Sequence, residues 1–367
     1  MRLLLFSDLH LDSSFAWMGV NAAAARRLRS SLRECLLRIL QLAQQEQADA
    51  ILCGGDLYEQ ERFAPDTASF LKSSFETVQP LPIFLAPGNH DWYGPGSLYQ
   101  QVDWPSNVHI FSENRLIPVE LKKGCILWGA AHTGPAQHES FLSGFRVNQE
   151  GLHLGLFHGS DSSWLAQQGE TKIGHAPFTS EEIVGSGLSH AFLGHYHAPK
   201  DAPAYTYPGN PQPLTFGEQG ERGAVLATVF EDGRLERRRL PVAQTAFSDV
   251  AVDITGIRTT LQIRERIAAE IEGRTGIARI TVYGEMPADL DLQLADLKPD
   301  STLLDACSIR AGDLRQAYNL AAIAGEPTVR GQFVRDVQSA DLSEEDKRRI
   351  LLTGLRALDG REDLEVL

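Results

Sequence analysis

Residues 83–91 read Ile-Phe-Leu-Ala-Pro-Gly-Asn-His-Asp, so a short apolar run is followed by Pro-Gly and then by three polar residues. The apolar run predicts a buried strand, and Pro-Gly predicts the turn that ends it. Asn89, His90 and Asp91 are therefore expected at the carboxyl end of a strand. Gly-Asn-His-Asp in this setting seldom arises by chance, and it is the most specific indication of a polar site in the chain.

Four shorter motifs have the same form, because each also follows an apolar run. In chain order they are Asp8-x-His10 in SDLHLD, Gly55-Asp56 in GGDLYE, His158 in LFHG, and Gly194-His195-x-His197 in FLGHYH. Each motif is weak alone, since a single aspartate or histidine is more often a turn former or a satisfied buried polar group. All five in order, each at a strand end, predict one site.

The residue types in these motifs are those of a two-metal centre. Residues two apart in a strand point to the same face, so Asp8 and His10 are expected to reach one ion. Carboxylate oxygen and imidazole nitrogen together suit Mn, Fe or Zn. Asp56 is the expected bridging carboxylate, because a two-metal site needs an anion between cations about 3.5–4 Å apart. Two such cations lower the pKa of a bound water and hold the phosphoryl oxygens of the substrate. Asn89 adds a neutral oxygen.

A phosphate-ester hydrolase also needs a proton donor for the leaving alkoxide. A histidine outside the ligand set, held by a carboxylate, is the expected donor. His90 fits this position, and Asp91 follows it directly in the sequence. We therefore predict His90 and Asp91 as the catalytic residues.

Short strands and helices alternate through the first part of the chain. Residues 2–7 and 50–53 read as strands, and residues 22–47 have apolar side chains at helical spacing. This rhythm predicts an α/β core with polar residues at the strand ends. Further short strands follow, separated by turn residues.

Three parts are predicted along the chain. Residues 1–245 contain all five motifs and form the catalytic domain. Residues 246–318 begin a new strand–helix–strand unit, which predicts a smaller α/β domain. Residues 319–367 form a helical tail, in which Ser343 is a plausible helix cap because acidic residues follow it.

Composition limits the class of protein. The chain has 367 residues, of which 43% are hydrophobic and 22% charged, as in ordinary globular proteins. The four cysteines are scattered without a CxxC pair, which argues against a thiolate metal site and a disulfide framework. No signal peptide and no membrane-length apolar run is present, so we expect a cytoplasmic protein that does not bind membranes. The net charge of −14 disfavours nucleic-acid coating by bulk electrostatics.

The motif set resembles the calcineurin-like metallophosphoesterase superfamily over roughly the first two thirds of the chain. Within that superfamily it is most similar to the SbcD-like DNA-repair exonucleases, on the segments SDLHLD, GGDLYE, LAPGNHD, GLFHGS, FLGHYH and YPGNPQPLTFGE. The last segment is informative, because many other phosphoesterases lack it. The resemblance implies a metallophosphoesterase β-sandwich flanked by helices, a smaller α/β capping domain and a helical C-terminal tail. The last two match by position and length only.

The resemblance also implies roles for the motif residues. One metal would be held by Asp8, His10, Asp56 and His197, and the other by Asp56, Asn89, His158 and His195. His90 would protonate the leaving group or stabilise the phosphate. The implied metal is Mn²⁺, with Fe²⁺ or Zn²⁺ as alternatives. The implied partners are DNA, a coiled-coil ATPase of the SbcC type and a second copy of the chain. Glu59 departs from the pattern, since archaeal relatives often carry histidine near this position.

Three functions remain open on the sequence. The first is a 3′-to-5′ DNA exonuclease and single-strand endonuclease subunit of an SbcCD-like repair complex. The second is a small-molecule phosphodiesterase or pyrophosphatase, which the acidic charge favours, and the third is a scaffold. Histidines outside the motifs are more simply packing or surface residues: His109, His132, His138, His153, His175 and His190. The basic run at residues 234–239 is more simply a solvated strand face than a phosphate contact.

Overall fold

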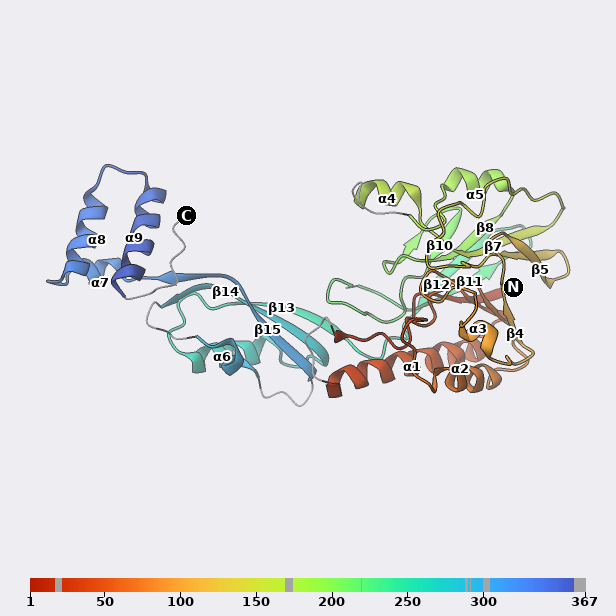
Figure 1. Ribbon diagram of the computed structural model, residues 1–367, viewed down its shortest axis with the longest axis horizontal. Helices are drawn as coiled ribbons and strands as arrows, with labels where there is room; N and C mark the ends of the chain where they lie inside the picture. Colours follow the sequence, from red (N-terminus) through yellow and green to blue (C-terminus); the bar gives the residue numbers. More distant parts are fainter. Residues whose placement is uncertain are drawn as a thin grey trace. The chain divides into compact units, whose positions relative to one another are not determined.

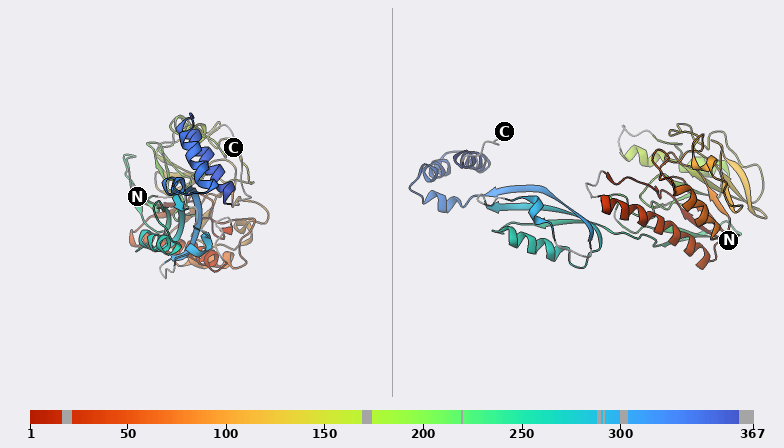
Figure 2. Two further views of the ribbon diagram at one scale, coloured as in Figure 1. Left: turned by 90° about the vertical axis from the view of Figure 1, so that its left-hand side faces the viewer. Right: turned by 60° about the horizontal axis from the view of Figure 1, so that its bottom comes forward.

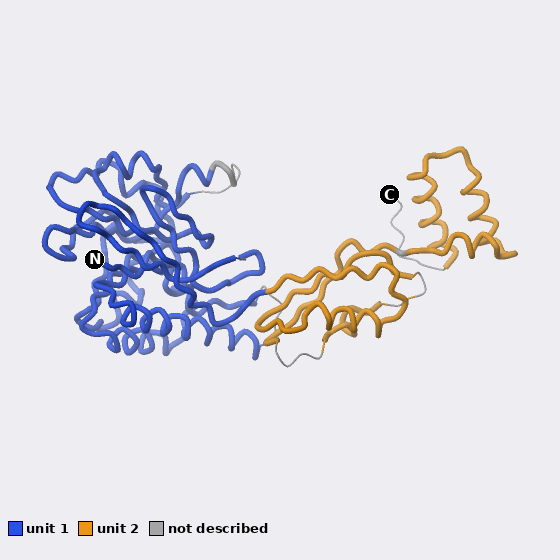
Figure 3. Tube along the Cα trace, turned by 180° about the vertical axis from the view of Figure 1, so that it is seen from behind, with its two compact units in different colours: residues 1–247 blue, residues 248–367 orange. Residues whose placement is uncertain are grey.

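The computed structural model describes residues 1–16, 22–168, 174–218, 220–287, 290, 292–299 and 304–359. The chain forms two compact units, residues 1–247 and 248–367 (Figure 3). The end of the predicted helical tail, residues 360–367, lies outside the described part of the chain. Of the helices in that part, none has the length and apolar character that a membrane crossing requires.

The first sheet of unit 1 has six strands in the order β12-β11-β1-β2-β3-β4. Strands β1 to β4 are parallel, whereas β11 runs antiparallel to β1 and β12 antiparallel to β11. The bounds are β1 Arg2–Phe6, β2 Ala50–Cys53, β3 Ile83–Leu85, β4 Val108–Ile110, β11 Ala224–Val229 and β12 Leu235–Leu240.

The second sheet also has six strands, in the order β5-β6-β7-β8-β10-β9. Its centre, from β6 through β7 and β8 to β10, is parallel, and both edge strands are antiparallel to their neighbours. The bounds are β5 Ile117–Lys122, β6 Cys125–Gly129, β7 Leu152–His158, β8 His190–Gly194, β9 Lys200–Asp201 and β10 Tyr205–Tyr207.

The two sheets pack face to face and share one apolar core. Leu5 and Leu52 of the first sheet belong to the same buried cluster as Leu127 and Leu156 of the second. Helices α1 and α2 lie along the outer face of the first sheet, and α4 and α5 lie beyond the second (Figures 1 and 2). The helix bounds are α1 Ala22–Gln45, α2 Thr67–Glu76, α3 Leu98–Gln101, α4 Ser162–Gln168 and α5 Ser180–Ser186. The predicted sandwich flanked by helices is confirmed.

The parallel strands end level with one another, and this register positions the site. Phe6 pairs with Cys53, and Cys53 pairs with Leu85, so β1, β2 and β3 finish together. In the second sheet, the last residues of β7 and β8, His158 and Gly194, are paired. Because carboxyl ends of parallel strands share one edge, all five motifs leave the sandwich at the same end.

Unit 2 contains a three-stranded sheet of β13 (Phe247–Asp253), β14 (Gly276–Pro287) and β15 (Leu304–Ala317). Helix α6 (Thr260–Glu270) covers one face, and its Ile263 and Ile267 are buried with Val252 and Val282 of the sheet. A short 3-10 helix, Leu294–Leu297, precedes β15. The helices α7 (Leu320–Ala324), α8 (Val329–Ser339) and α9 (Glu344–Leu358) have a second, separate core. The division of this region at residue 318 stays a prediction.

Candidate metal centre

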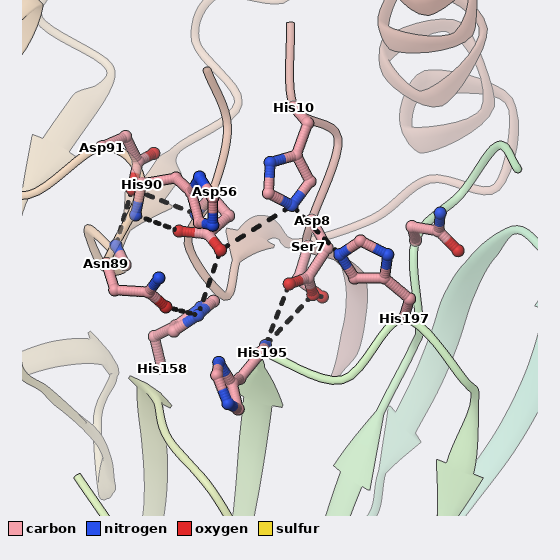
Figure 4. A network of polar contacts seen from close by, with 12 residues as sticks. Ser7, Asp8, His10, Asp56, Asn89, His90, Asp91, His158, His195 and His197 are labelled. Atoms are coloured by element: carbon pink, nitrogen blue, oxygen red, sulfur yellow. Dashed lines mark hydrogen bonds and ion pairs between the residues drawn. The ribbon is translucent and has the colours of Figure 1, made fainter. Parts of the chain in front are cut away.

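The motif side chains gather at the carboxyl edge of the sandwich, where Figure 4 shows them around one space. They come from five loops or strand ends of both sheets. Asp8 and His10 follow β1, Asp56 follows β2, Asn89 to Asp91 follow β3, His158 ends β7, and His195 and His197 follow β8. The sandwich therefore brings together segments that lie far apart in the sequence.

The loop after β1 reaches the site through unusual backbone geometry. Asp8 and His10 have φ of 54° and 49°, and Asp56 in the next loop has 52°, all in the left-handed region that non-glycine residues seldom adopt. The two loops hold each other, because Asp8 N donates to Gly55 O at 2.9 Å and His10 N donates to Asp56 O at 3.0 Å. The strand-alternation argument for Asp8 and His10 is therefore wrong: both lie beyond β1, and the turn aims them.

Three overlapping groups of side chains could each hold a cation. They are Asp8, His10 and His197; Asp8, Asp56 and His158; and His10, Asp56 and His90, each with ligand atoms within 4.8 Å of one another. Asp8, His10 and Asp56 each belong to two of the groups, so the three groups form one continuous cluster. Asn89 joins the second group, since its Oδ1 lies 3.0 Å from His158 Nε2.

The protonation of the imidazoles fits a cation between them. His10 Nδ1 lies 2.8 Å from Glu59 Oε1, and His197 Nδ1 lies 2.6 Å from Glu218 Oε1. Because each carboxylate accepts the Nδ1 proton, both Nε2 atoms can present lone pairs, and these atoms face each other at 3.2 Å. A proton on one of these Nε2 atoms makes the contact a hydrogen bond, and a divalent cation bound by both lone pairs would replace that proton. The donor set of carboxylates and imidazoles suits a borderline divalent ion.

Asp56 is a buried carboxylate whose negative charge is stabilised by neighbouring positive charge. Its side chain is buried, and burial alone would raise its pKa, but His158 and His10 lower the pKa well below the usual range. Reciprocally, burial would lower the pKa of His158, yet Asp56, with its Oδ2 at 3.3 Å, raises it to about 9. A proton thus occupies the place that a cation would take, and metal binding here would release it.

His195 is less engaged than its neighbours. Its backbone N–H donates to both carboxylate oxygens of Asp8, at 3.1 and 3.2 Å, and its ring packs edge-on against His158 with centroids 5.2 Å apart. Burial lowers the pKa of His195 well below 6.5, so the ring is neutral and able to act as a ligand. His195 stands outside the three groups above.

His90 has a different acidic partner from the one that the sequence predicts. Its Nδ1 lies 3.3 Å from Glu59 Oε2. Asp91 is fully buried, and its carboxylate accepts from the backbone N–H groups of Asp56, Leu57 and Gly88. It also accepts from the Tyr99 hydroxyl at 2.6 Å. The expected pairing of Asp91 with His90 is therefore corrected: Asp91 fixes the backbone around the site, and Glu59 is the acid that contacts His90. A catalytic role for Asp91 stays a prediction.

Comparisons with known proteins identify the family. The sequence model of the family described as "Calcineurin-like phosphoesterase" matches residues 1–199, more than half of the chain. The chain belongs to the calcineurin-like phosphoesterase family. It is 28% identical over 261 residues to "Uncharacterized metallophosphoesterase YhaO" of Bacillus subtilis (strain 168), an alignment that covers 68% of this chain and 62% of that protein.

One solved structure gives a weaker likeness. The crystal structure of TT1561 of Thermus thermophilus aligns with a TM-score of 0.37 at 14% sequence identity, over 65% of this chain and 98% of that one.

Calcineurin-like phosphoesterases typically bind two divalent metal ions, and the clusters around Asp8 and Asp56 are candidate sites for them.

Two residues that contact this phosphoesterase site, Glu59 and Glu218, were not predicted from the sequence, whereas His132 and His175 pack behind it as expected. Glu218 ends the YPGNPQPLTFGE segment and lies 21 residues from His197, so no local pattern marks it as a partner of that histidine. Glu59 was noted only as a departure. His132 is fully buried behind the site: its Nε2 donates to His158 O at 2.8 Å, and its Nδ1 has no hydrogen-bond partner. His175 packs against His195, with ring centroids 5.5 Å apart.

The basic run of β12 joins the two sheets. Arg237 donates to Ala202 O at 2.9 Å, and Arg239 donates to Pro208 O at 2.6 Å, both in the loops that flank β10. Arg238 is paired with Glu46 at the end of α1. These contacts give the run a structural role.

Proposed function

We propose that this phosphoesterase is a two-metal DNA phosphodiesterase, which acts as a 3′-to-5′ exonuclease and single-strand endonuclease. The observation that carries the proposal is the convergence of Asp8 and Asp56 with the imidazoles of His10, His158 and His197 in one cluster, in which all but the partly exposed His197 are buried. Two divalent ions there, with Mn²⁺ as the proposed metal, would supply a nucleophile at neutral pH and hold the phosphoryl oxygens.

His90 and Glu59 are placed to supply the proton for the leaving group. His90 is at the exposed edge, with 45% of its side chain accessible, whereas the side chains of His10 and Asp56 are 4% and 3% accessible. Glu59 holds the His90 ring by Nδ1 and so leaves Nε2 free to donate a proton to a leaving oxygen. His90 N also donates to Asp56 Oδ1 at 2.8 Å, which couples the position of the donor to that of the bridging carboxylate.

The DNA assignment is supported by two features beyond the motif set. The YPGNPQPLTFGE segment is part of the site, because its Glu218 contacts His197. Unit 2 adds a sheet and helices with their own cores, which a minimal small-molecule hydrolase does not need. The net charge of −14 argues the other way, since DNA contacts need basic residues.

A coiled-coil ATPase of the SbcC type is the proposed partner, and a homodimer is proposed for the phosphoesterase itself. Apolar side chains exposed on α8, on α9 and between them support the tail as the ATPase surface: Val329, Leu342, Ile350 and Leu358. A cytoplasmic location belongs to the same proposal. Co-purification of the ATPase with the full chain, and its loss without residues 319–367, tests the surface. Analytical ultracentrifugation tests the dimer.

The decisive experiment is cleavage of end-labelled oligonucleotides by the purified chain with Mn²⁺. Single-stranded and duplex substrates are compared, each labelled at the 5′ or the 3′ end, with and without the ATPase. We expect stepwise shortening from the 3′ end and cleavage within single strands. If bis(p-nitrophenyl) phosphate is turned over while every oligonucleotide stays intact, even with the ATPase, the DNA assignment is wrong.

The second candidate is a phosphodiesterase or pyrophosphatase for small molecules, and the acidic charge of the chain favours it. Cyclic nucleotides and nucleotide-linked pyrophosphates are its test substrates. Their turnover in place of DNA cleavage would establish this alternative.

A further inference from the structure

The two halves of the metal centre differ in what holds their histidines from outside. The first half is Asp8, His10 and His197, and the second half is Asn89, His158 and His195. Asp56 lies between the halves, with its Oδ2 3.8 Å from His10 Nε2 and 3.3 Å from His158 Nε2. The contrast concerns the ring nitrogens that face away from this shared carboxylate.

Both histidines of the first half are held by carboxylates. Glu59 contacts His10 Nδ1 at 2.8 Å, and Glu218 contacts His197 Nδ1 at 2.6 Å. Each carboxylate is only 13% accessible, so water screens it weakly.

Glu218 is itself fixed by the segment in which it lies. Its Oε2 accepts from Asn210 Nδ2 at 2.7 Å and from the backbone N–H of Leu214 at 2.6 Å. Arg222 donates to Glu218 O at 2.9 Å and to His197 O at 2.6 Å. Asn210 is fully buried. His197 is therefore held at its ring and at its carbonyl, and its Nε2 can point only into the site.

The second half has neutral outer contacts. His158 Nδ1 donates to the backbone carbonyl of Gly54 at 2.9 Å. Asn89 contributes an uncharged oxygen. The ring of His195 packs against the rings of His158 and Tyr196. In the described part of the chain, Asp56 is the one carboxylate within ion-pair distance of a ring nitrogen of this half.

We propose that the two halves bind metal with unequal affinity and in a fixed order, and that Glu218 and Glu59 make the first half fill first. The inference rests on the proposed two-metal function. A carboxylate that accepts the outer proton of a ligand histidine fixes its tautomer and increases its basicity, and loss of such a partner typically costs roughly 10- to 100-fold in metal affinity. Glu218 is thus a positioning residue for His197, and Glu59 for His10.

Mn²⁺ titration of the metal-free full chain tests the proposal, with free Mn²⁺ followed by electron paramagnetic resonance and heat by calorimetry. We expect two resolved steps in the wild type. Glu218→Gln should weaken the tighter step about 10- to 100-fold and leave the other unchanged. Glu59→Gln, a second variant in a different loop, should act on the same step. Asn89→Ala should weaken only the weaker step.

Glu182→Gln is the matched control. Glu182 belongs to the N-terminal capping box of α5, a role that glutamine also fills. The substitution should therefore leave both binding steps unchanged. Circular dichroism identifies any misfolded variant, and Glu59→Gln then carries the test.

Two results would overturn this inference alone: two ions that bind the wild type with one affinity, or glutamate variants that weaken the weaker step. The assay contains no DNA, so its outcome is separate from that of the proposed function. Unequal steps in a protein that cleaves no DNA would uphold this inference and reject the DNA assignment. A single ion per chain would reject both the order and the two-metal centre.

Discussion

Glu59 Oε2 lies 3.3 Å from His90 Nδ1, and this contact joins two loops that follow different strands of the first sheet. The hydrogen bond that His90 donates to Glu59 raises the pKa of His90 to about 9 against the effect of burial. The pair is therefore imidazolium and carboxylate at neutral pH. The His90 imidazolium therefore carries a proton at the exposed edge of the site, where it can be donated to a leaving oxygen.

Replacing Glu59 by glutamine should lower the pKa of His90. In the wild type the imidazolium persists up to about pH 9 and is lost above it. Without the carboxylate, deprotonation should move towards the ordinary value of about 6.5. NMR titration of the metal-free protein measures this directly. The rate of diester hydrolysis should begin to fall at lower pH in the variant than in the wild type.

Glu61→Gln is the control for this prediction, because Glu61 is exposed and lies two residues further along the same loop. An unchanged His90 titration in Glu59→Gln, with the same result in the control, would show that Glu59 does not set the proton affinity of His90.

Replacing His90 by asparagine should separate metal binding from turnover. His90 is the exposed member of the cluster, so its loss should leave the stability and the metal content near wild-type values. The rate should fall by roughly 10²- to 10⁴-fold, the usual contribution of a general acid. Elemental analysis and single-turnover rates measure the two effects. A variant that keeps its rate would remove His90 from the mechanism.

Asp91→Asn should have the opposite profile. The buried Asp91 carboxylate accepts from three backbone N–H groups and the Tyr99 hydroxyl, and an amide cannot replace both acceptor oxygens. We expect a loss of about 2–4 kcal/mol in the free energy of unfolding of the metal-free protein. Urea denaturation measures it, with His90→Asn as the matched neighbour. Full stability with lost turnover would support the chemical role predicted for Asp91 from its sequence position.

The sequence predicted the site through local patterns, and its errors have a common physical cause. Each motif follows an apolar run, and the parallel register of the strands brings the run ends together. Partners from other loops carry no such local signal. Glu59 and His90 are 31 residues apart and meet only in the folded chain. Asp91 was the predicted partner of His90 only because the two residues are adjacent in the sequence. Adjacent residues often point apart, and Asp91 points into the core.

The left-handed turn after β1 was also beyond the reach of sequence patterns. Asp8 and His10 are not glycines, so nothing in the sequence indicates that their φ angles are positive. Side-chain alternation along an extended strand was therefore the default expectation. The turn is stabilised by Gly55 O and Asp56 O from the next loop. A local conformation that depends on a distant backbone cannot be inferred from the local sequence alone.

Gly194→Ala should damage the site by separating the two sheets. A Cβ at Gly194 would overlap the carbonyl oxygen of Gly54 and lie 2.9 Å from His158 Nδ1. Overpacking of this kind costs about 1–3 kcal/mol, and here it would also displace His158. Thermal unfolding and Mn²⁺ titration should both show the loss. Gly185→Ala is the control, since Gly185 lies in α5 and a Cβ there would contact nothing within 4 Å.

Unit 1 expressed alone, residues 1–247, should fold and keep the metal centre. Each site residue named above lies within it, and its buried clusters are formed by its own strands and helices. The truncated protein should bind Mn²⁺ as the full chain does and hydrolyse bis(p-nitrophenyl) phosphate at the full-length rate, because the small diester needs only the site. On duplex DNA it should be inactive if unit 2 positions the substrate. Equal activity on duplex DNA with and without residues 248–367 would show that unit 1 alone recognises DNA, and would leave unit 2 for the ATPase.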